Sequence, residues 1–375
     1  MDLASRYDVV ILGGGPAGFA AALSLRSSPD LRILVVEAQA PGQQRIGESC
    51  PPDVMVPLAR LGLAAEFKDA GHAPCPGFAS SWGRPGVGYN DFIVNPLGPG
   101  WRLDRKAFDR MLAEAATARG VDVAWRTRFR GVEPAAEPGL GHRLHFARTG
   151  PATCSIDAAF VIDATGSQAH FARALGIARQ IDDKLFARVR FARIAAGDLE
   201  TEQVMLEATP QGWWYAAALP GNGVVAMMVG EADAVRALGR SDAGYDRILN
   251  ATSFVGPALA TLRLDCMSYR TLPIRSGILG RLEGTDWLAV GDAAASYDPV
   301  MAQGIYKALT DGIAGGQAIA AHLEGRGSMD GSYAQRIRDR YRAYLQSRAH
   351  LYGLEQRWPE SPFWRNRHAI RQGQD

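Results

Sequence analysis

Val9-Val10-Ile11-Leu12-Gly13-Gly14-Gly15-Pro16-Ala17-Gly18 is the stretch of sequence that decides the fold. The continuous apolar run over residues 7–12 predicts a buried parallel strand, and the Ala-rich run over residues 16–27 predicts a helix. Between them, G-x-G-x-x-G places Gly13 in a tight turn, Gly15 where backbone approaches phosphate, and Gly18 where helix and strand pack closely. Pro16 and Ala17 open the helix, whose free N–H groups would face a pyrophosphate.

A second strand is predicted over residues 31–37, with Glu37 at its end, 24 residues after Gly13. An acid at this spacing binds a ribose hydroxyl in dinucleotide-binding folds. Strand, helix and acid together predict a dinucleotide site, and a glycine-rich turn without a ligand is the alternative. The motif alone does not distinguish NAD from FAD.

A second glycine motif, Trp287-Leu288-Ala289-Val290-Gly291-Asp292-Ala293-Ala294, lies far along the chain. It resembles the Gly-Asp strand of the FAD-binding fold of the aromatic hydroxylases, whose carboxylate receives the ribityl chain. The resemblance extends through Asp298-Pro299-Val300-Met301-Ala302-Gln303-Gly304 and implies that Pro299 and Gly304 pass the isoalloxazine edge. It also implies that the following helix directs its N-terminus at the flavin. FAD is therefore the expected cofactor, and an ordinary strand-turn-helix is the alternative.

The expected fold is α/β: a Rossmann-type FAD-binding fold of the aromatic-hydroxylase kind with an inserted antiparallel-sheet substrate domain. The predicted FAD-binding domain is discontinuous, over residues 1–75, 98–178 and 274–330. The substrate-domain sheet takes residues 76–97 and 179–273, and a helical segment takes residues 331–375. Strands are predicted at residues 78–82, 91–94, 121–130, 144–148, 158–162, 185–194, 202–207, 212–219 and 224–229, and helices at 54–61, 64–70, 103–119, 233–238, 305–323 and 331–352.

Composition limits the class of protein. With 375 residues, of which 47% are apolar and 21% charged, the sequence is typical of a soluble globular protein. The net charge of +2 gives no footprint for nucleic acid. No apolar run reaches the length of about 18 residues that a membrane span needs, and no signal peptide precedes the first strand. Four scattered cysteines without metal-binding spacing indicate free thiols and no metal, so a cytoplasmic location is expected.

The same resemblance implies further residues beside FAD. Arg45 and Arg105 stand where the family uses arginine, although each could equally be a surface residue. Phe129 stands where the family contacts adenine through its backbone. Glu48 and Ser49 belong to a Gly-Glu-Ser-x-x-Pro segment that resembles the strap of flavin-dependent halogenases, which links the flavin site to the substrate site.

Two departures argue against halogenation. In the halogenases a lysine opens a K-x-G-x-x-F-x-W segment and carries the chlorinating species, whereas Cys75 stands at that place here and Lys68 is out of register. A thiol would quench hypochlorous acid. The halogenase W-x-W-x-I-P motif is also altered, over residues 212–220. The segment over residues 163–167 resembles the halogenases more than the nicotinamide-receiving motif of single-component hydroxylases, so reduced flavin would come from a separate reductase or from NAD(P)H.

The closest resemblance is to the short flavoproteins that mature tryptophylquinone enzymes, such as the lysine-oxidase and glycine-oxidase maturation flavoproteins. It is carried by residues 81–83, 100–105, 212–215 and 355–364. It implies hydroxylation of a tryptophan side chain in a partner protein. Trp82, Trp213 and Tyr215 are the candidates for orienting the substrate, and packing in the core is the alternative for them.

The resulting prediction is an FAD-dependent monooxygenase that uses O2 and reduced flavin and acts through a flavin C4a-hydroperoxide on an electron-rich aromatic ring. A small-molecule hydroxylase, a flavin-dependent halogenase and a non-enzymatic FAD-bound chaperone are the alternatives. The sequence assigns no general base, and it leaves the role of Cys75 open.

Overall fold

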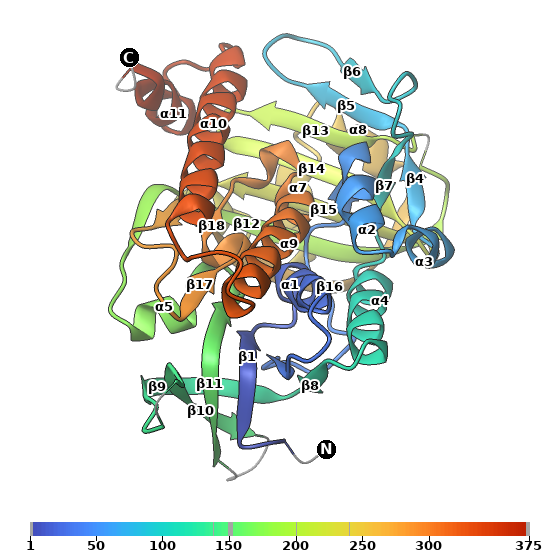
Figure 1. Cartoon of the computed structure of the whole chain (residues 1–375). Helices are drawn as coiled ribbons and strands as arrows, with labels where there is room; N and C mark the ends of the chain where they lie inside the picture. Colours follow the sequence, from blue (N-terminus) through green and yellow to red (C-terminus); the bar gives the residue numbers. More distant parts are fainter. Residues whose placement is uncertain (1–2, 138, 149–152, 200, 240, 373–375) are drawn as a thin grey trace.

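The computed structural model describes residues 3–137, 139–148, 153–199, 201–239 and 241–372. The described residues form two large β-sheets, one of seven strands and one of eight, and a smaller sheet of three strands. Helices α1 (Pro16–Leu25) and α9 (Gly304–Leu323) lie against the first sheet, and α10 (Ser332–Leu354) runs up beside the second (Figure 1).

The seven-stranded sheet has the order β8-β2-β1-β11-β10-β9, and β17 also pairs with β11. The strands β8, β2, β1, β11 and β17 are parallel, whereas β11, β10 and β9 are joined antiparallel. The bounds are β1 Arg6–Leu12, β2 Ile33–Val36, β8 Asp122–Ala124, β9 Thr127–Pro134, β10 His142–Arg148, β11 Thr153–Asp163 and β17 Trp287–Ala289. The central strands are apolar throughout because both of their faces are covered.

The contact between α1 and α9 is unusually close. A Cβ atom on Gly312 would lie 2.3 Å from the backbone oxygen of Ala17, and one on Gly316 would lie 2.7 Å from that of Ala21. Helix α4 (Arg105–Ala118) covers the other side of α1, and its N-cap Asp104 accepts hydrogen bonds from the two N–H groups of Lys106 and Ala107. This packing fixes α1, whose N-terminus borders the site described below.

The eight-stranded sheet has the order β18-β16-β12-β15-β14-β13-β5-β6 and is antiparallel except where β13 pairs with β5. The bounds are β5 Gly77–Ser81, β6 Gly88–Asp91, β12 Arg179–Ala196, β13 Val204–Thr209, β14 Gly212–Leu219, β15 Gly223–Gly230, β16 Arg263–Leu279 and β18 Ala295–Ser296. One face packs on α10 and α11 (Pro362–Gln372) through Tyr352, Phe363 and Trp364. The other face is covered by α6 (Ala232–Ala237), α7 (Asp242–Leu249) and α8 (Val255–Ala260).

The three-stranded sheet has the order β3-β7-β4 and lies near α2 and α3 (Figure 1). The bounds are β3 Ser49–Cys50, β4 Ala73–Cys75, β7 Gly100–Arg102, α2 Met55–Arg60 and α3 Ala64–Asp69. A further short helix, α5 (His170–Ala174), follows β11. Because β3 continues the segment 46–48, this small sheet anchors the predicted strap.

Several predicted elements differ from the structure. The strand predicted at residues 91–94 is wrong: β6 ends at Asp91, and the apolar side chains of Ile93 and Val94 are almost fully exposed in a turn. The strand predicted at 121–130 is divided into β8 and β9 at Arg126, which has a left-handed backbone (φ +52°). The predicted helix 16–27 ends at Leu25.

The prediction also missed α5, α7, α8, α11 and most of β16. Polar residues, Pro273 and Gly277 interrupt the alternation of β16, which is partly or fully exposed along most of its length. The helices over residues 103–119, 305–323 and 331–352 are confirmed as α4, α9 and α10. In the structure β5 and β6 pair within the same sheet as strands more than 100 residues later. The predicted domain boundaries stay a proposal.

We expect the variant Gly312→Ala to lose about 1–3 kcal/mol of stability, because its new methyl group must displace the backbone of α1. The matched control is Gly131→Ala on β9, where a Cβ atom meets nothing within 4 Å. Urea unfolding measures both. A Gly312→Ala variant as stable as the control would contradict the close packing of α1 on α9.

Candidate functional site

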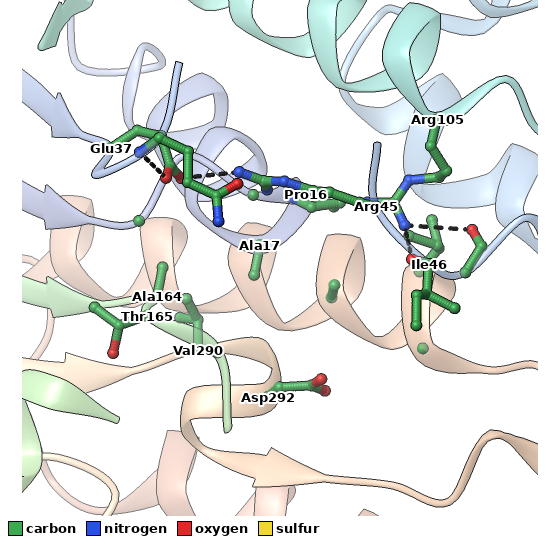
Figure 2. A pocket seen from close by; sticks show the side chains of 18 of the residues that line it. Pro16, Ala17, Glu37, Arg45, Ile46, Arg105, Ala164, Thr165, Val290 and Asp292 are labelled. Carbon is green, nitrogen blue, oxygen red and sulfur yellow. Dashed lines mark hydrogen bonds and ion pairs between the residues drawn. The ribbon is translucent and has the colours of Figure 1, made fainter. Parts of the chain in front are cut away.

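A cavity of about 830 Å³ opens at the carboxyl ends of β1, β2 and β11 and continues toward the second sheet. Figure 2 shows that its walls come from the turn before α1, the segment around Arg45 and Ile46, the end of β11 and the stretch from Val290 to Asp292. Ligands of open α/β sheets bind at this edge. The cavity is thus placed where the glycine motifs predict a dinucleotide.

The first glycine turn has the geometry of an anion site. Gly13 has a left-handed backbone (φ +115°), and a Cβ atom there would lie 2.2 Å from the oxygen of Ala164. The N-cap residue Gly15 has no side chain to cap α1, and Pro16 occupies its first turn. The unpaired N–H groups of α1 therefore face the cavity with the positive end of the helix dipole.

Glu37 and Arg45 meet across this turn (Figure 2). The carboxylate of Glu37 accepts hydrogen bonds from the N–H groups of Gly14 (2.9 Å) and Gln39 (2.8 Å) and from Arg45 Nη2 (3.0 Å). Arg45 Nη1 lies within 3.3 Å of the position that a Cβ atom on Gly15 would take. A fixed guanidinium beside a free helix N-terminus suits a pyrophosphate.

The strap segment carries a buried carboxyl group. Glu48 is 2% exposed; its Oε2 accepts a hydrogen bond from the N–H of Gly47 (3.1 Å), while Oε1 has no partner among the described residues. Burial raises the pKa of Glu48 to about 7, although the nearby Arg105 opposes this. The Arg105 guanidinium is itself buried and holds the strap by donating to the carbonyl oxygens of Ile46 and Gly47.

The far end of the cavity reaches the second sheet. Ser49 Oγ and the Tyr215 hydroxyl lie 2.7 Å apart, and burial raises the pKa of Tyr215 well above its usual range. Met227 and Ile274 complete this wall with apolar side chains. This end is therefore drier than the end at Glu37 and Arg45.

The second glycine motif places Asp292 on the cavity wall with half of its side chain exposed. Its Oδ1 lies 3.0 Å from the Nζ atom of Lys307, which is 2% exposed. Lys307 also donates to the oxygen of Ala295 (2.7 Å) and lies 3.7 Å from Asp311. Burial lowers the pKa of Lys307, and the attraction of Asp292 opposes that shift. The lysine orients Asp292 from behind.

These features fit FAD. The uncapped helix and Arg45 match the pyrophosphate, Glu37 the ribose, and the exposed oxygens of Asp292 the ribityl hydroxyls. Glu48 lines the cavity, and a polar atom of the ligand would give its unpartnered Oε1 a hydrogen bond. The fit rests on the uncapped N-terminus of α1 and on the buried Glu48 oxygen that no described residue satisfies.

Most of the predicted site residues line this cavity. They are Gly13, Gly15, Pro16, Ala17, Glu37, Arg45, Glu48, Ser49, Arg105, Phe129, Tyr215, Asp292, Pro299 and Gly304. Gly18 lies behind the turn, where a Cβ atom would be 1.9 Å from the oxygen of Gly13. Their contacts with FAD stay a prediction.

Trp82 and Trp213 are not among the lining residues. Both lie in the core between the second sheet and the C-terminal helices, where Trp82 Nε1 donates to the oxygen of Leu351 and Trp213 Nε1 to the hydroxyl of Tyr352. Their positions favour the core-packing alternative over contact with a substrate. Their aromatic character could not reveal which sheet face they occupy.

Sequence reasoning missed Lys307, Met227 and Ile274. The scarcity of lysine, with four in the chain, was a usable signal for Lys307, because a lysine within an otherwise apolar helix needs a buried partner. Met227 and Ile274 offered no signal, since apolar residues on a strand are common in any core.

Comparison with known proteins defines the family. The model of the FAD binding domain family matches residues 6–347, and the chain belongs to this family. The putative FAD-dependent oxidoreductase LodB of Marinomonas mediterranea is 30% identical over 368 residues, which cover 97% of each chain. The cofactor is thus FAD and the protein a flavin-dependent oxidoreductase of the hydroxylase and halogenase type, as predicted.

Two solved structures share the fold. The myxobacterial chondrochloren halogenase CndH has a TM-score of 0.86 at 23% identity and covers 99% of this chain and 89% of its own. QhpG, a peptidyl tryptophan dihydroxylase essential for tryptophylquinone cofactor biogenesis, has a TM-score of 0.72 at 22% identity. The match covers 96% of this chain and 78% of QhpG. Both structures confirm the Rossmann-type α/β fold. In the part of the chain that the structure describes, no helix has the length and apolar character to cross a membrane.

Replacing Lys307 with methionine should weaken FAD binding roughly tenfold, because Asp292 loses its charged partner while the apolar stem is kept. Lys106→Met, at an exposed position on α4, is the control. Fluorescence titration with FAD measures both. Equal affinities in the two variants would show that Lys307 does not orient Asp292.

Because Glu48 is buried, the free energy of unfolding of the FAD-free protein should fall as the pH rises. The Glu48 pKa of about 7 in the folded state exceeds the ordinary value of 4.5, so the unfolded chain releases its proton first and the folded state is penalised progressively between these values. The cost above pH 7 reaches about 3 kcal/mol. Urea unfolding of Glu48→Gln across this range should show a flatter profile than the wild type, and parallel profiles would refute the assignment.

Proposed function

We propose that this protein is an FAD-dependent monooxygenase that hydroxylates an electron-rich aromatic ring, in particular a tryptophan side chain of a partner protein during quinone-cofactor maturation. The observation that carries the choice of hydroxylation is the absence of lysine among the described residues that line the cavity. The halogenases that the sequence resembles need a lysine between flavin and substrate.

The four lysines of the chain lie elsewhere. Lys68, Lys106 and Lys184 are exposed on the surface, and the buried Lys307 is paired with Asp292. An amine in that ion pair is committed to a carboxylate and to the oxygen of Ala295. It is not available to carry an electrophile to a substrate.

Cys75 does not replace the lysine. Its side chain is 1% exposed, and its thiol donates to the oxygen of Gly77 at 3.2 Å. Burial raises its pKa, which keeps it a thiol rather than a reactive thiolate. Its position in β4, away from the cavity lining, favours a packing role.

Residues along the cavity have different proposed roles in binding the cofactor and the substrate. The turn at Gly13 and Gly15 with Arg45 would hold the pyrophosphate, and Asp292 would hold the ribityl chain. When bound and reduced, FAD supplies the activation of O2. The apolar wall of Met227 and Ile274 would exclude water from the reacting ring.

Tyr215 and Ser49 are the polar groups at the end of the cavity toward the second sheet. Because the pKa of Tyr215 is raised, its hydroxyl keeps its proton, and its oxygen can accept a hydrogen bond from the indole N–H of a tryptophan side chain. Pro299 and Gly304 would border the flavin ring. We propose Tyr215 as the residue that orients the substrate.

One comparison supports a polypeptide substrate: QhpG, which shares the fold, is a peptidyl tryptophan dihydroxylase. We propose that reduced flavin comes from a separate reductase, with direct reduction by NAD(P)H as the alternative. Four cysteines without disulfides support a cytoplasmic setting as part of this proposal.

The product identifies the reaction. With reduced FAD, O2 and chloride, a tryptophan-bearing candidate partner polypeptide, chosen from the products of the neighbouring genes, should gain about 16 mass units per hydroxylation, located on tryptophan by peptide fragmentation. Free tryptophan and indole, supplied in parallel, should remain unchanged.

A gain of about 34 mass units would establish halogenation instead. Conversion of the free indoles but not of the polypeptide would establish the small-molecule hydroxylase. Oxidation of reduced flavin without any product, in the presence of the polypeptide, would favour the FAD-bound chaperone.

A further inference from the structure

The loop over residues 298–304 has a backbone that its surroundings must hold in place. It contains a short 3₁₀ turn, Pro299–Met301, followed by Ala302 in the left-handed region (φ +51°, ψ +25°). A residue with a Cβ atom is disfavoured there, and such a conformation persists where neighbouring contacts determine it. Asp298, Pro299, Ala302 and Gly304 all line the FAD cavity.

The contacts that determine this loop converge on Asp298, which is 2% exposed. Its carboxylate accepts a hydrogen bond from the N–H of Val300 (3.0 Å), which caps the 3₁₀ turn. From helix α10, the hydroxyl of Tyr352 donates to Oδ2 (2.8 Å) and Arg348 Nε lies 3.3 Å from the same oxygen. The N–H of Asp298 in turn donates to the hydroxyl of Tyr344 (2.7 Å).

Tyr352 connects this loop to the second sheet. Trp213 Nε1, a group that can donate but not accept, gives its hydrogen bond to the hydroxyl of Tyr352 (3.0 Å). The single proton of that hydroxyl is then directed at Asp298. Burial and the Asp298 carboxylate raise the pKa of Tyr352 well above its usual range, so the proton stays in place.

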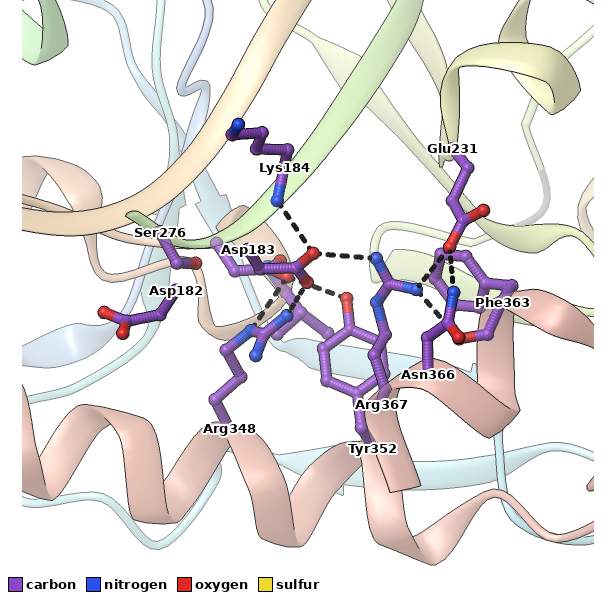
Figure 3. Close-up of polar contacts among 12 residues, drawn as sticks. Asp182, Asp183, Lys184, Glu231, Ser276, Arg348, Tyr352, Phe363, Asn366 and Arg367 are labelled. Atoms are coloured by element: carbon purple, nitrogen blue, oxygen red, sulfur yellow. Dashed lines mark hydrogen bonds and ion pairs between the residues drawn. The ribbon is translucent and has the colours of Figure 1, made fainter. Parts of the chain in front are cut away.

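Opposite charges hold the helix itself. Figure 3 shows Arg348 and Arg367 approaching Asp183 of β12 from two sides, and Arg367 also reaching Glu231. The two arginines are each 3% exposed, so their charges are compensated in a medium of low dielectric. Helices α10 and α11 are thereby fixed to the sheet at the point where Tyr352 meets Asp298.

We propose that Tyr352 is a positioning residue for the flavin: supported by Trp213, it fixes Asp298 and so sets the conformation of the loop 298–304 that borders the cofactor. This role needs FAD in the cavity but does not depend on which aromatic substrate the enzyme takes. It also gives Trp213 a function at a distance from the cavity, through two hydrogen bonds in series.

The test compares two conservative variants of the full-length protein. Tyr352→Phe removes the hydroxyl that joins Trp213 to Asp298 and keeps the ring. Tyr245→Phe is the matched control: Tyr245 is 1% exposed, and its hydroxyl donates to a carbonyl oxygen, that of Ala226 (2.8 Å), on the sheet face covered by α6–α8. Both variants lose one buried hydroxyl, but only the first touches the loop.

For Tyr352→Phe we expect the FAD dissociation constant to rise roughly three- to tenfold, because the loop transmits only part of the loss of a hydrogen bond to a charged group. We also expect a shifted visible absorption band and a shifted reduction potential of the bound flavin. Tyr245→Phe should lose thermal stability to a similar extent. Its FAD dissociation constant should stay within twofold of the wild type, and its absorption band and reduction potential should not shift. None of these readouts requires a substrate, so they fail or succeed independently of the proposed function.

An unchanged FAD affinity, spectrum and potential in Tyr352→Phe, with only the melting temperature lowered, would overturn the proposal. If that variant does not fold, Tyr344→Phe decides, because it removes another anchor of Asp298 on α10 and leaves Tyr352 intact. Altered flavin properties in Tyr344→Phe support the proposal, and properties equal to those of Tyr245→Phe reject it.

Discussion

Close approach of backbone to backbone around α1 is the constraint on which the site depends. Gly13 passes against Ala164, Gly18 lies over Gly13, and Gly312 of α9 lies against Ala17, each at a distance that a side chain would prevent. These approaches place the helix between the parallel sheet and α9 with its N-terminus open to the cavity. The anion site is therefore a property of the backbone, and the surrounding side chains refine it.

The features that the sequence predicts well are those that local chemistry determines. The turn at Gly13 and the Gly-Asp pair ending at Asp292 reflect requirements of a few consecutive residues, and the acid Glu37 follows the turn at a typical spacing, so all three are visible without the rest of the fold. Their meeting in one cavity follows from the parallel order of β1, β2 and β11, whose carboxyl ends share an edge.

The features that the sequence predicts poorly depend on distant partners. Trp213 and Trp82 occur in an aromatic motif that suggests a substrate pocket, yet α10 and α11, more than 100 residues later, cover them and make them core. Ile93 and Val94 show the opposite error. These apolar residues are predicted to form a strand, yet they lie exposed in a turn. Whether a remote helix covers a pair of apolar residues or leaves them exposed has no signature in the sequence near either pair.

The C-terminal helices thus complete the molecule in two senses: they bury one face of the second sheet, and they hold Asp298 beside the cofactor cavity. A site assembled in this way has a polar end shaped by the glycine turns and an apolar end shaped by the second sheet. Oxygen chemistry needs both, because the cofactor must be held by its phosphates while its reacting ring stays dry.

The source of the oxygen in the product tests the central claim most directly. Turnover of the tryptophan-bearing polypeptide under isotopically heavy O2 in ordinary water should place the heavy isotope on the tryptophan ring, as a monooxygenase requires. A product that carries oxygen from water, or one with the isotope pattern of chlorine, would contradict the account.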